Sequence, residues 1–142
     1  MNGEILSVLY RDTCVPKKSY VNDSTPMSVC IYMISCKDES VSDKYIGQTR
    51  DFEVRRTYHM KDCSSDKQQY VHRFIHTHGG WDNWNIIIIE EYICNFIESL
   101  IIEWYWWNKV GASLNKAIPG IKYVRHIHIS RILEIEVNCR LT

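Results

Sequence analysis

The segment between Asn95 and Gly111 constrains the fold of this 142-residue chain more than any other. Asn95 and Glu98 have the spacing of a helix capping box, and Gly111 is a residue type that ends helices, so the sequence predicts a helix over 96–110. Its centre, LIIEWYWW, is apolar on nearly every side, and such a helix is usually buried. Other elements must therefore surround this helix, and Glu103 is expected inside the molecule.

Three apolar segments are expected to form a sheet beside this helix. The first, SVCIYMIS at 28–35, is rich in β-forming residues, and KYIG at 44–47 follows it after a polar loop, which predicts a hairpin. The third, NWNIIIIEEY at 83–92, has the composition of a buried strand.

Two further helices are predicted between the second and third strands. Thr49 or Asp51 is a candidate N-cap for a helix that runs to about Lys61, and a second helix from roughly 67 to 77 ends at the glycine pair 79–80. The expected fold class is α+β, a small three-stranded antiparallel sheet flanked by helices.

The chain is expected to hold one compact domain at 28–118 between two smaller segments. Pro16 and Pro26 favour an irregular leader over 1–27. The C-terminal extension, 119–142, alternates polar and apolar residues as HIHI and EIEV, without a turn that would make a hairpin.

Charge and cysteine content exclude several classes of protein. The 17 basic residues balance 17 acidic ones, so any site for a polyanion must be a local patch. The six cysteines form no CxxC pair, which argues against a zinc ribbon or finger. We find neither the pattern of a signal peptide nor that of a membrane span, so we expect a soluble, intracellular protein with reduced thiols and no membrane partner.

Tyrosine, arginine and histidine lie close together in KYIGQTRDFEVRRTYH. Arg55 and His59 are four residues apart and share one helix face, whereas Arg56 points about 100° away. Tyr32 and Tyr45 lie on the two strands of the expected hairpin, so their hydroxyls can converge. Each feature also has an ordinary interpretation: a solvated basic face for the arginine and histidine, and simple packing for the tyrosines.

Glu103 has two interpretations as well. An ionised carboxylate inside an apolar helix is costly unless it meets a metal ion or an arginine. The ordinary alternative is a structural salt bridge, or a side chain that reaches solvent.

The histidines at 72, 76 and 78 have one spacing that zinc sites use. No cysteine or carboxylate with suitable spacing accompanies them, so we interpret them as histidines on a helix surface.

The order and spacing of these features resemble the GIY-YIG nuclease family. The resemblance covers residues 29–116 and includes CIY at 30–32, YIG at 45–47, Arg55, His59, Glu103 with a Trp three residues later, and LN at 114–115. The segment YIGQTRDFEVRRTYH is especially similar to phage and viral homing-type endonucleases of this family. Cys30 stands where the family name has Gly, a small residue replacing a smaller one.

The resemblance implies a role for each residue of the cluster. Tyr32 would be the general base or would orient the attacking water, and Tyr45 would share that work. A tyrosine is a poor base unless cations favour its ionised form, and Arg55 would supply such a cation and stabilise charge on the phosphate. His59 would assist proton transfer or hold a phosphate.

The resemblance also implies a metal site and contacts with DNA. Glu103 would hold one divalent metal ion, Mg²⁺ or Mn²⁺, as a hard oxygen ligand. Asn115 would brace the site or hold a phosphate. Basic residues around the second motif would contact the DNA backbone: Lys44, Arg50, Arg56 and Lys61.

The implied function is metal-dependent cleavage of DNA by water, with 28–118 as the catalytic domain. Two alternatives stay open: a catalytically silent nucleic-acid-binding or scaffold protein on the same fold, and a structure-selective repair nuclease. The extension is too short for a large recognition domain and has no zinc or helix-turn-helix signature, so a partner protein or self-association would supply targeting.

Overall fold

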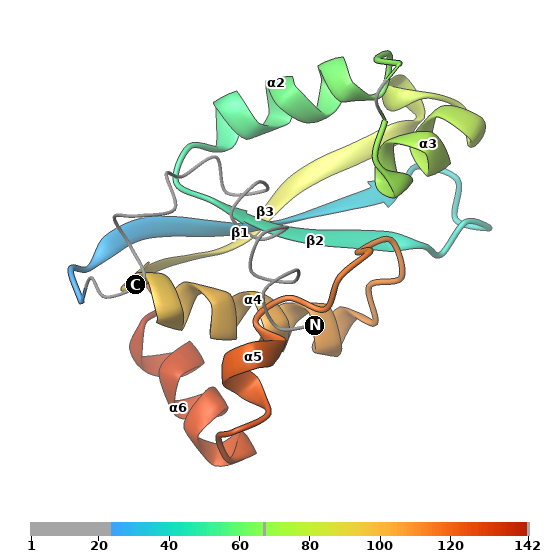
Figure 1. Cartoon of the computed structure of the whole chain (residues 1–142). Helices are drawn as coiled ribbons and strands as arrows, with labels where there is room; N and C mark the ends of the chain where they lie inside the picture. Colours follow the sequence, from blue (N-terminus) through green and yellow to red (C-terminus); the bar gives the residue numbers. More distant parts are fainter. Residues whose placement is uncertain (1–23, 67, 142) are drawn as a thin grey trace.

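A three-stranded antiparallel sheet is the centre of the fold (Figure 1). The computed structural model describes residues 24–66 and 68–141. β1 (Met27–Cys36) is the middle strand and pairs with β2 (Lys44–Thr49) on one side and β3 (Trp84–Cys94) on the other. The predicted α+β class, with three antiparallel strands and flanking helices, is confirmed.

Helices cover both faces of this sheet. Above it in Figure 1 lie α2 (Phe52–Asp62) and α3 (Tyr70–Thr77), and below it lies α4 (Phe96–Val110). Each layer has its own hydrophobic core. The upper core includes Ile34, Val71, Ile75 and Trp84, and the lower core includes Ile31, Ile46, Ile101 and Ile102.

The register of the hairpin places both motif tyrosines on the upper face. Tyr32 lies opposite Gly47, and Ile34 lies opposite Tyr45. Paired residues point to the same side of a sheet and neighbours along a strand point to opposite sides, so Tyr32 and Tyr45 both face α2 and α3.

Helix boundaries follow the predicted caps at most ends. The Asp51 carboxylate accepts a hydrogen bond from the Val54 N–H at 3.1 Å, and Asn95 and Glu98 form the expected capping box. Gly111 ends α4 in the left-handed conformation, with φ of 69°. The second helix differs from the prediction, because α3 begins at Tyr70 and its N-cap residue makes no side-chain hydrogen bond.

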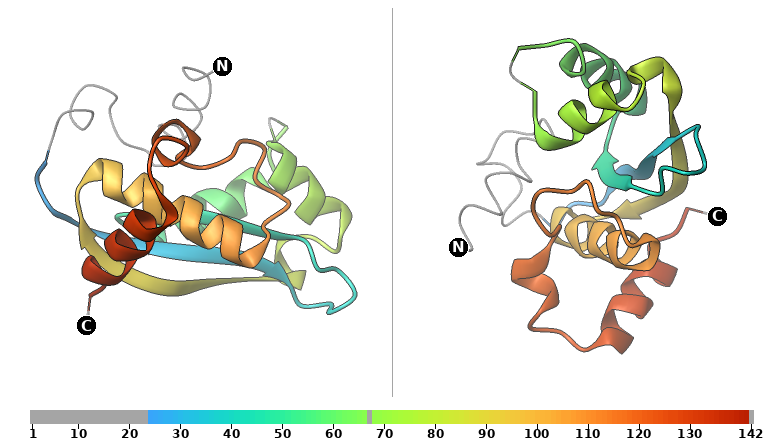
Figure 2. Two further views of the ribbon diagram at one scale, coloured as in Figure 1. Left: turned by 90° about the horizontal axis from the view of Figure 1, so that it is seen from below. Right: turned by 90° about the vertical axis from the view of Figure 1, so that its right-hand side faces the viewer.

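The alternating C-terminal segment forms helices rather than an extended chain. α5 (Ile121–Val124) and α6 (Ile129–Asn138) pack on α4, on the side away from the sheet (Figure 2). Ile132, Ile135 and Cys139 recur at helical spacing and join the lower core. Their period, rather than the local HIHI and EIEV alternation, decides the structure.

A buried polar network ties α6 to β3. The Glu136 side chain is 1% exposed and accepts hydrogen bonds from the Tyr92 hydroxyl at 2.9 Å and from Arg140 Nε at 2.8 Å. Trp106 of α4 donates to the same tyrosine oxygen at 2.7 Å. Burial is the main cause that raises the pKa of Tyr92 above its ordinary value.

The two ends of the chain lie partly outside the described fold. The irregular leader at 1–27 falls largely on residues outside those that the structure describes, and the division at 118 is not tested by the fold. Within 24–66 and 68–141, no helix combines the length and apolar character needed to cross a membrane.

Candidate active site

The upper face of the sheet brings Tyr32, Tyr45 and His59 into contact. The Tyr32 hydroxyl oxygen lies 2.8 Å from His59 Nε2. The two tyrosine rings are 6.2 Å apart between centroids, and the Tyr45 ring lies 5.6 Å from that of His59. The two tyrosine rings therefore lie close together on this face, and the histidine lies beside both.

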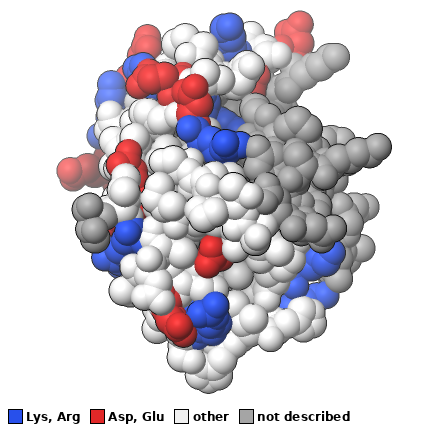
Figure 3. Space-filling view, turned by 90° about the vertical axis from the view of Figure 1, so that its left-hand side faces the viewer, with Lys and Arg blue, Asp and Glu red and all other residues white. Residues whose placement is uncertain are grey.

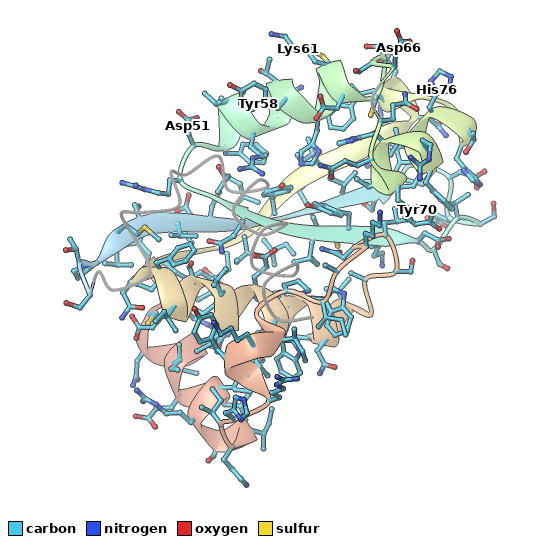
Figure 4. The ribbon with its side chains drawn as sticks, viewed as in Figure 1. Asp51, Tyr58, Lys61, Asp66, Tyr70 and His76 are labelled. Atoms are coloured by element: carbon cyan, nitrogen blue, oxygen red, sulfur yellow. The ribbon has the colours of Figure 1, made fainter. Side chains whose placement is uncertain are left out.

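α2 places its charged residues on two different sides. Arg55 and His59 share one face of the helix, as their spacing predicted, and each is only 5% exposed, so the alternative of a solvated basic face was wrong. Lys61 points away from the sheet, whereas Asp51 marks the start of the helix (Figure 4). The outer side of α2 is therefore available to solvent while its inner side forms the site.

Gly47 of the YIG motif makes room for the Tyr32 ring. A Cβ atom added at Gly47 would lie 2.3 Å from the Cζ and hydroxyl oxygen of Tyr32, far inside van der Waals contact. The tyrosine of the first motif thus packs directly over the glycine of the second, and a side chain at position 47 would displace the hydroxyl from His59.

The charge of Arg55 acts on the centre of this cluster. Burial, the neighbouring His72 and the Arg55 guanidinium together lower the pKa of His59 to about 3, so that its imidazole is neutral at pH 7. The same guanidinium opposes the effect of burial on Cys30, whose thiol pKa is raised to about 11. Cys30, which stands where the family name has Gly, thus also lies within reach of the Arg55 charge.

His72 belongs to this cluster, and its assignment to the helix surface was wrong. It is 2% exposed, and its Nε2 lies 2.9 Å from His59 Nδ1. Burial lowers the pKa of His72, although the Asp62 carboxylate opposes this effect. His76 is exposed as expected. The His78 ring stacks on the Phe74 ring, with 3.9 Å between the ring centroids.

Sequence reasoning missed His72 for an identifiable reason. His72 is buried together with Val71 and Ile75, on the side of α3 that packs toward the upper core. The hydrophobic spacing of Val71 and Ile75 was the available signal, because a residue three positions before Ile75 shares its face.

Asn115 links the loop after α4 to the second motif. Its side-chain oxygen accepts from the Ile46 N–H at 3.0 Å, and its side-chain nitrogen donates to the Ile46 carbonyl at 2.7 Å. This two-point contact is the geometry of a brace for β2, one residue from Tyr45. Glu103 lies in α4, the helix on the opposite face of the sheet, and is 3% exposed.

The expected DNA-binding cations differ in their exposure to solvent. Lys44 is half-buried, whereas the side chains of Arg50, Arg56 and Lys61 are exposed. Arg56 lies 3.7 Å from Glu53 in an exposed ion pair. On the face shown in Figure 3, basic and acidic side chains are interspersed over a largely uncharged surface.

A family model described as the GIY-YIG catalytic domain matches residues 28–116, more than half of the chain. The chain belongs to the GIY-YIG family. No curated protein and no solved structure matches it.

GIY-YIG domains are nuclease domains, and the motifs that name the family lie here at 30–32 and 45–47. The two motifs lie on the paired strands β1 and β2, where Tyr32 lies opposite Gly47. Cys30, in place of the first glycine, is 8% exposed within the described fold and fits without disturbing the pairing with Thr49.

The metal ion expected of this GIY-YIG domain would take few of its ligands from the protein. Among residues 24–66 and 68–141, no group of three or more His, Cys, Asp or Glu side chains is arranged to enclose a metal. Mg²⁺ is usually held by one or two carboxylates while water and substrate phosphates supply the other ligands. Glu103 is the buried carboxylate predicted for this role, but it belongs to α4, on the opposite face of the sheet from Tyr32 and His59.

Proposed function

We propose that this domain is a metal-dependent DNA endonuclease that hydrolyses phosphodiester bonds. The observation that carries the proposal is the 2.8 Å contact between the Tyr32 hydroxyl and His59 Nε2. The charge of Arg55 acts on the same histidine and helps to lower its pKa. Hydrolysis of a phosphodiester needs a group that takes a proton from water and a cation that stabilises the charge on phosphorus.

Tyr32 is the proposed group that activates water. A phenol oxygen accepts a proton only as the phenolate, and that form is stabilised by a nearby cation and by hydrogen bonds to the oxygen. Arg55 provides the cation, and His59 provides the hydrogen-bond contact at 2.8 Å. Tyr45, whose ring centroid lies 6.2 Å from that of Tyr32, would help to orient the water.

Arg55, Glu103 and Asn115 complete the proposed machinery. The Arg55 guanidinium would stabilise the extra negative charge of the pentavalent phosphate. The Glu103 carboxylate would hold one Mg²⁺ or Mn²⁺, which when bound supplies Lewis-acid stabilisation of the phosphate and leaving oxygens. Asn115, through its two hydrogen bonds to Ile46, would keep β2 and Tyr45 in place.

Substrate binding would rely on few charges. Exposed or half-exposed cations near the second motif are proposed to contact phosphates: Lys44, Arg50, Arg56 and Lys61. Because these contacts carry no sequence information, we propose that targeting depends on a partner protein or on self-association.

The test is cleavage of DNA by the purified protein. Supercoiled, linear and branched DNA are incubated with Mg²⁺, Mn²⁺ or EDTA, and the products are tested for ligation by DNA ligase. We expect metal-dependent nicking with ends that carry 5′-phosphate and 3′-hydroxyl groups, and no cleavage in EDTA. Binding without cleavage of any substrate would contradict the proposal and indicate a silent binding domain. Cleavage of branched DNA alone would indicate a structure-selective nuclease.

A further inference from the structure

Tyr32, His59 and His72 form a continuous chain of hydrogen-bond contacts across three elements. His59 Nε2 lies 2.8 Å from the Tyr32 oxygen, and His59 Nδ1 lies 2.9 Å from His72 Nε2. Their exposed fractions are 0%, 5% and 2%, so bulk water does not compete for these contacts. The function proposed above uses Tyr32 and His59 but gives His72 no role.

Two neutral imidazoles in contact can share their protons in only two ways. In one arrangement, His59 donates from Nδ1 to His72, and its bare Nε2 accepts the Tyr32 proton. In the other, His72 donates from Nε2 to His59 Nδ1, and His59 donates from Nε2 to the Tyr32 oxygen. The choice decides whether His59 faces Tyr32 as an acceptor or as a donor.

The far side of His72 favours the second arrangement. His72 Nδ1 is buried and makes no hydrogen bond within the part of the chain that the structure describes. The first arrangement would place a proton on that nitrogen and bury a donor without an acceptor. The second leaves only a lone pair there, and the neutral Tyr32 hydroxyl then directs its own proton to a group other than His59. Buried N–H groups without a partner are rarer in proteins than under-satisfied acceptors.

The electrostatics of His59 point the same way. In the first arrangement, proton transfer from Tyr32 would create an imidazolium next to the Arg55 guanidinium. Burial, His72 and Arg55 lower the pKa of His59 to about 3, which makes that imidazole a weak proton acceptor. In the second arrangement the neutral His59 donates to the Tyr32 oxygen and stabilises the phenolate that activates water.

We propose that His72 is a positioning residue, which fixes His59 as the Nε2–H tautomer so that His59 donates a hydrogen bond to the Tyr32 oxygen. This inference rests on the proposed nuclease function only for its catalytic consequence. The tautomer itself is a property of the folded protein. In general, the hydrogen-bond partner of one imidazole nitrogen decides whether the other nitrogen carries the proton.

Nitrogen-15 NMR of the histidine rings tests the inference without any cleavage assay. In the wild-type protein at pH 7, we expect His59 and His72 each to carry a proton on Nε2 and none on Nδ1. A proton on His59 Nδ1 would overturn the inference. The expected tautomers in a protein that never cleaves DNA would support the inference and contradict the proposed function instead.

Substitution at position 72 connects the tautomer with catalysis. In His72→Leu, which removes the donor, we expect a mixture of His59 tautomers and a loss of cleavage rate on the order of 10-fold or more, with DNA affinity unchanged. In His72→Gln, whose amide nitrogen can donate to His59 Nδ1, we expect the Nε2–H tautomer and a rate within about 3-fold of wild type.

The matched control is His76→Leu, which removes an exposed histidine from the same helix and should change neither readout. Retention of both the tautomer and the cleavage rate in His72→Leu would overturn the inference. If the leucine variant does not fold, the wild-type spectrum and the glutamine variant still decide the question.

Discussion

At the scale of single residues, the site is a set of neighbours that set one another's charge and protonation. Arg55 contributes to the low pKa of His59, and His59 contacts the oxygen of Tyr32. Gly47 leaves the space in which the Tyr32 ring lies. A change at one of these positions should therefore alter the chemistry of another.

Removal of either tyrosine hydroxyl tests its part in catalysis. We expect Tyr32→Phe and Tyr45→Phe each to reduce the cleavage rate roughly 100-fold or more, the usual scale for loss of acid–base assistance, while DNA binding hardly changes. Single-turnover cleavage and a binding titration measure the two effects separately. If both phenylalanine variants cleave at the wild-type rate, the hydroxyls serve only in packing.

The low pKa of His59 predicts how stability depends on pH. Its pKa is about 3 in the folded protein against an ordinary value of 6.5, so the unfolded chain binds a proton below pH 6.5 that the folded protein does not bind. This difference destabilises the fold as pH falls from 6.5 toward 3, by about 1.4 kcal/mol per pH unit, and has no effect at higher pH. Urea unfolding at pH 7, 6 and 5 measures the slope.

Two variants isolate the contribution of His59 to that slope. We expect His59→Gln to reduce the slope of unfolding free energy between pH 6 and 5 by about 1.4 kcal/mol per pH unit, which corresponds to one proton. His126→Gln removes an exposed histidine and should leave the slope as in wild type. An unchanged slope in His59→Gln would show that the buried imidazole is protonated in the fold.

At the scale of elements, the C-terminal helix depends on a buried carboxylate. Glu136 in α6 accepts hydrogen bonds from Tyr92 in β3 and from Arg140 at the end of the chain. This network lies in the lower layer, whereas the proposed catalytic chain lies in the upper one. Stability and cleavage should therefore respond separately to changes here.

The variant Arg140→Ala leaves the buried Glu136 carboxylate with fewer donors. We expect the free energy of unfolding to fall by about 1.5–3 kcal/mol, the scale of a hydrogen bond to a charged group, with no change in cleavage rate below the unfolding temperature. Arg131→Ala is the control, because its ion pair with Glu134 is exposed on both sides and should contribute less than about 1 kcal/mol. Equal effects from the two substitutions would contradict the account of this network.

Elements with strong local signals could be predicted from the sequence. The capping residues of α2 and α4 and the β-forming composition of β1 to β3 specify their structure within a few residues. The start of α3 was misplaced because Gln69 provides no side-chain cap. α5 and α6 depend on burial against α4, a long-range effect that local alternation does not reveal.

In the candidate site, too, local patterns predict some features and long-range packing decides others. The convergence of Tyr32 and Tyr45 follows from hairpin pairing, and the shared face of Arg55 and His59 follows from helical periodicity. The spacing of Val71 and Ile75 indicates the buried face of α3, but the contact of His72 with His59 depends on how α3 packs beside α2, a long-range effect.

At the scale of the whole molecule, the net charge of zero limits affinity for DNA. Residues 44–62 contain five basic and three acidic side chains, a net charge of +2. Arg55 is buried in the candidate site, and exposed Arg56 shares an ion pair with Glu53, so these two cations add little to non-specific binding of the DNA backbone.

We therefore expect weak binding with a shallow dependence on salt. The slope of log affinity against log salt should be roughly −2 to −4, and non-specific affinity should be no better than about micromolar at physiological salt. A salt titration with Glu103→Gln, which preserves the substrate, measures both quantities. A slope of about −8, or nanomolar binding to one sequence, would show that the segment after Asn115 is a recognition element.

The most direct test of the central claim is cleavage of supercoiled DNA by Glu103→Gln with Mg²⁺. Glutamine keeps the shape of the side chain and removes the charge that would hold the metal, so we expect cleavage to be abolished while circular dichroism and DNA binding stay as in wild type. Loss of folding would indicate a structural carboxylate. Cleavage at the wild-type rate would contradict the metal-dependent mechanism.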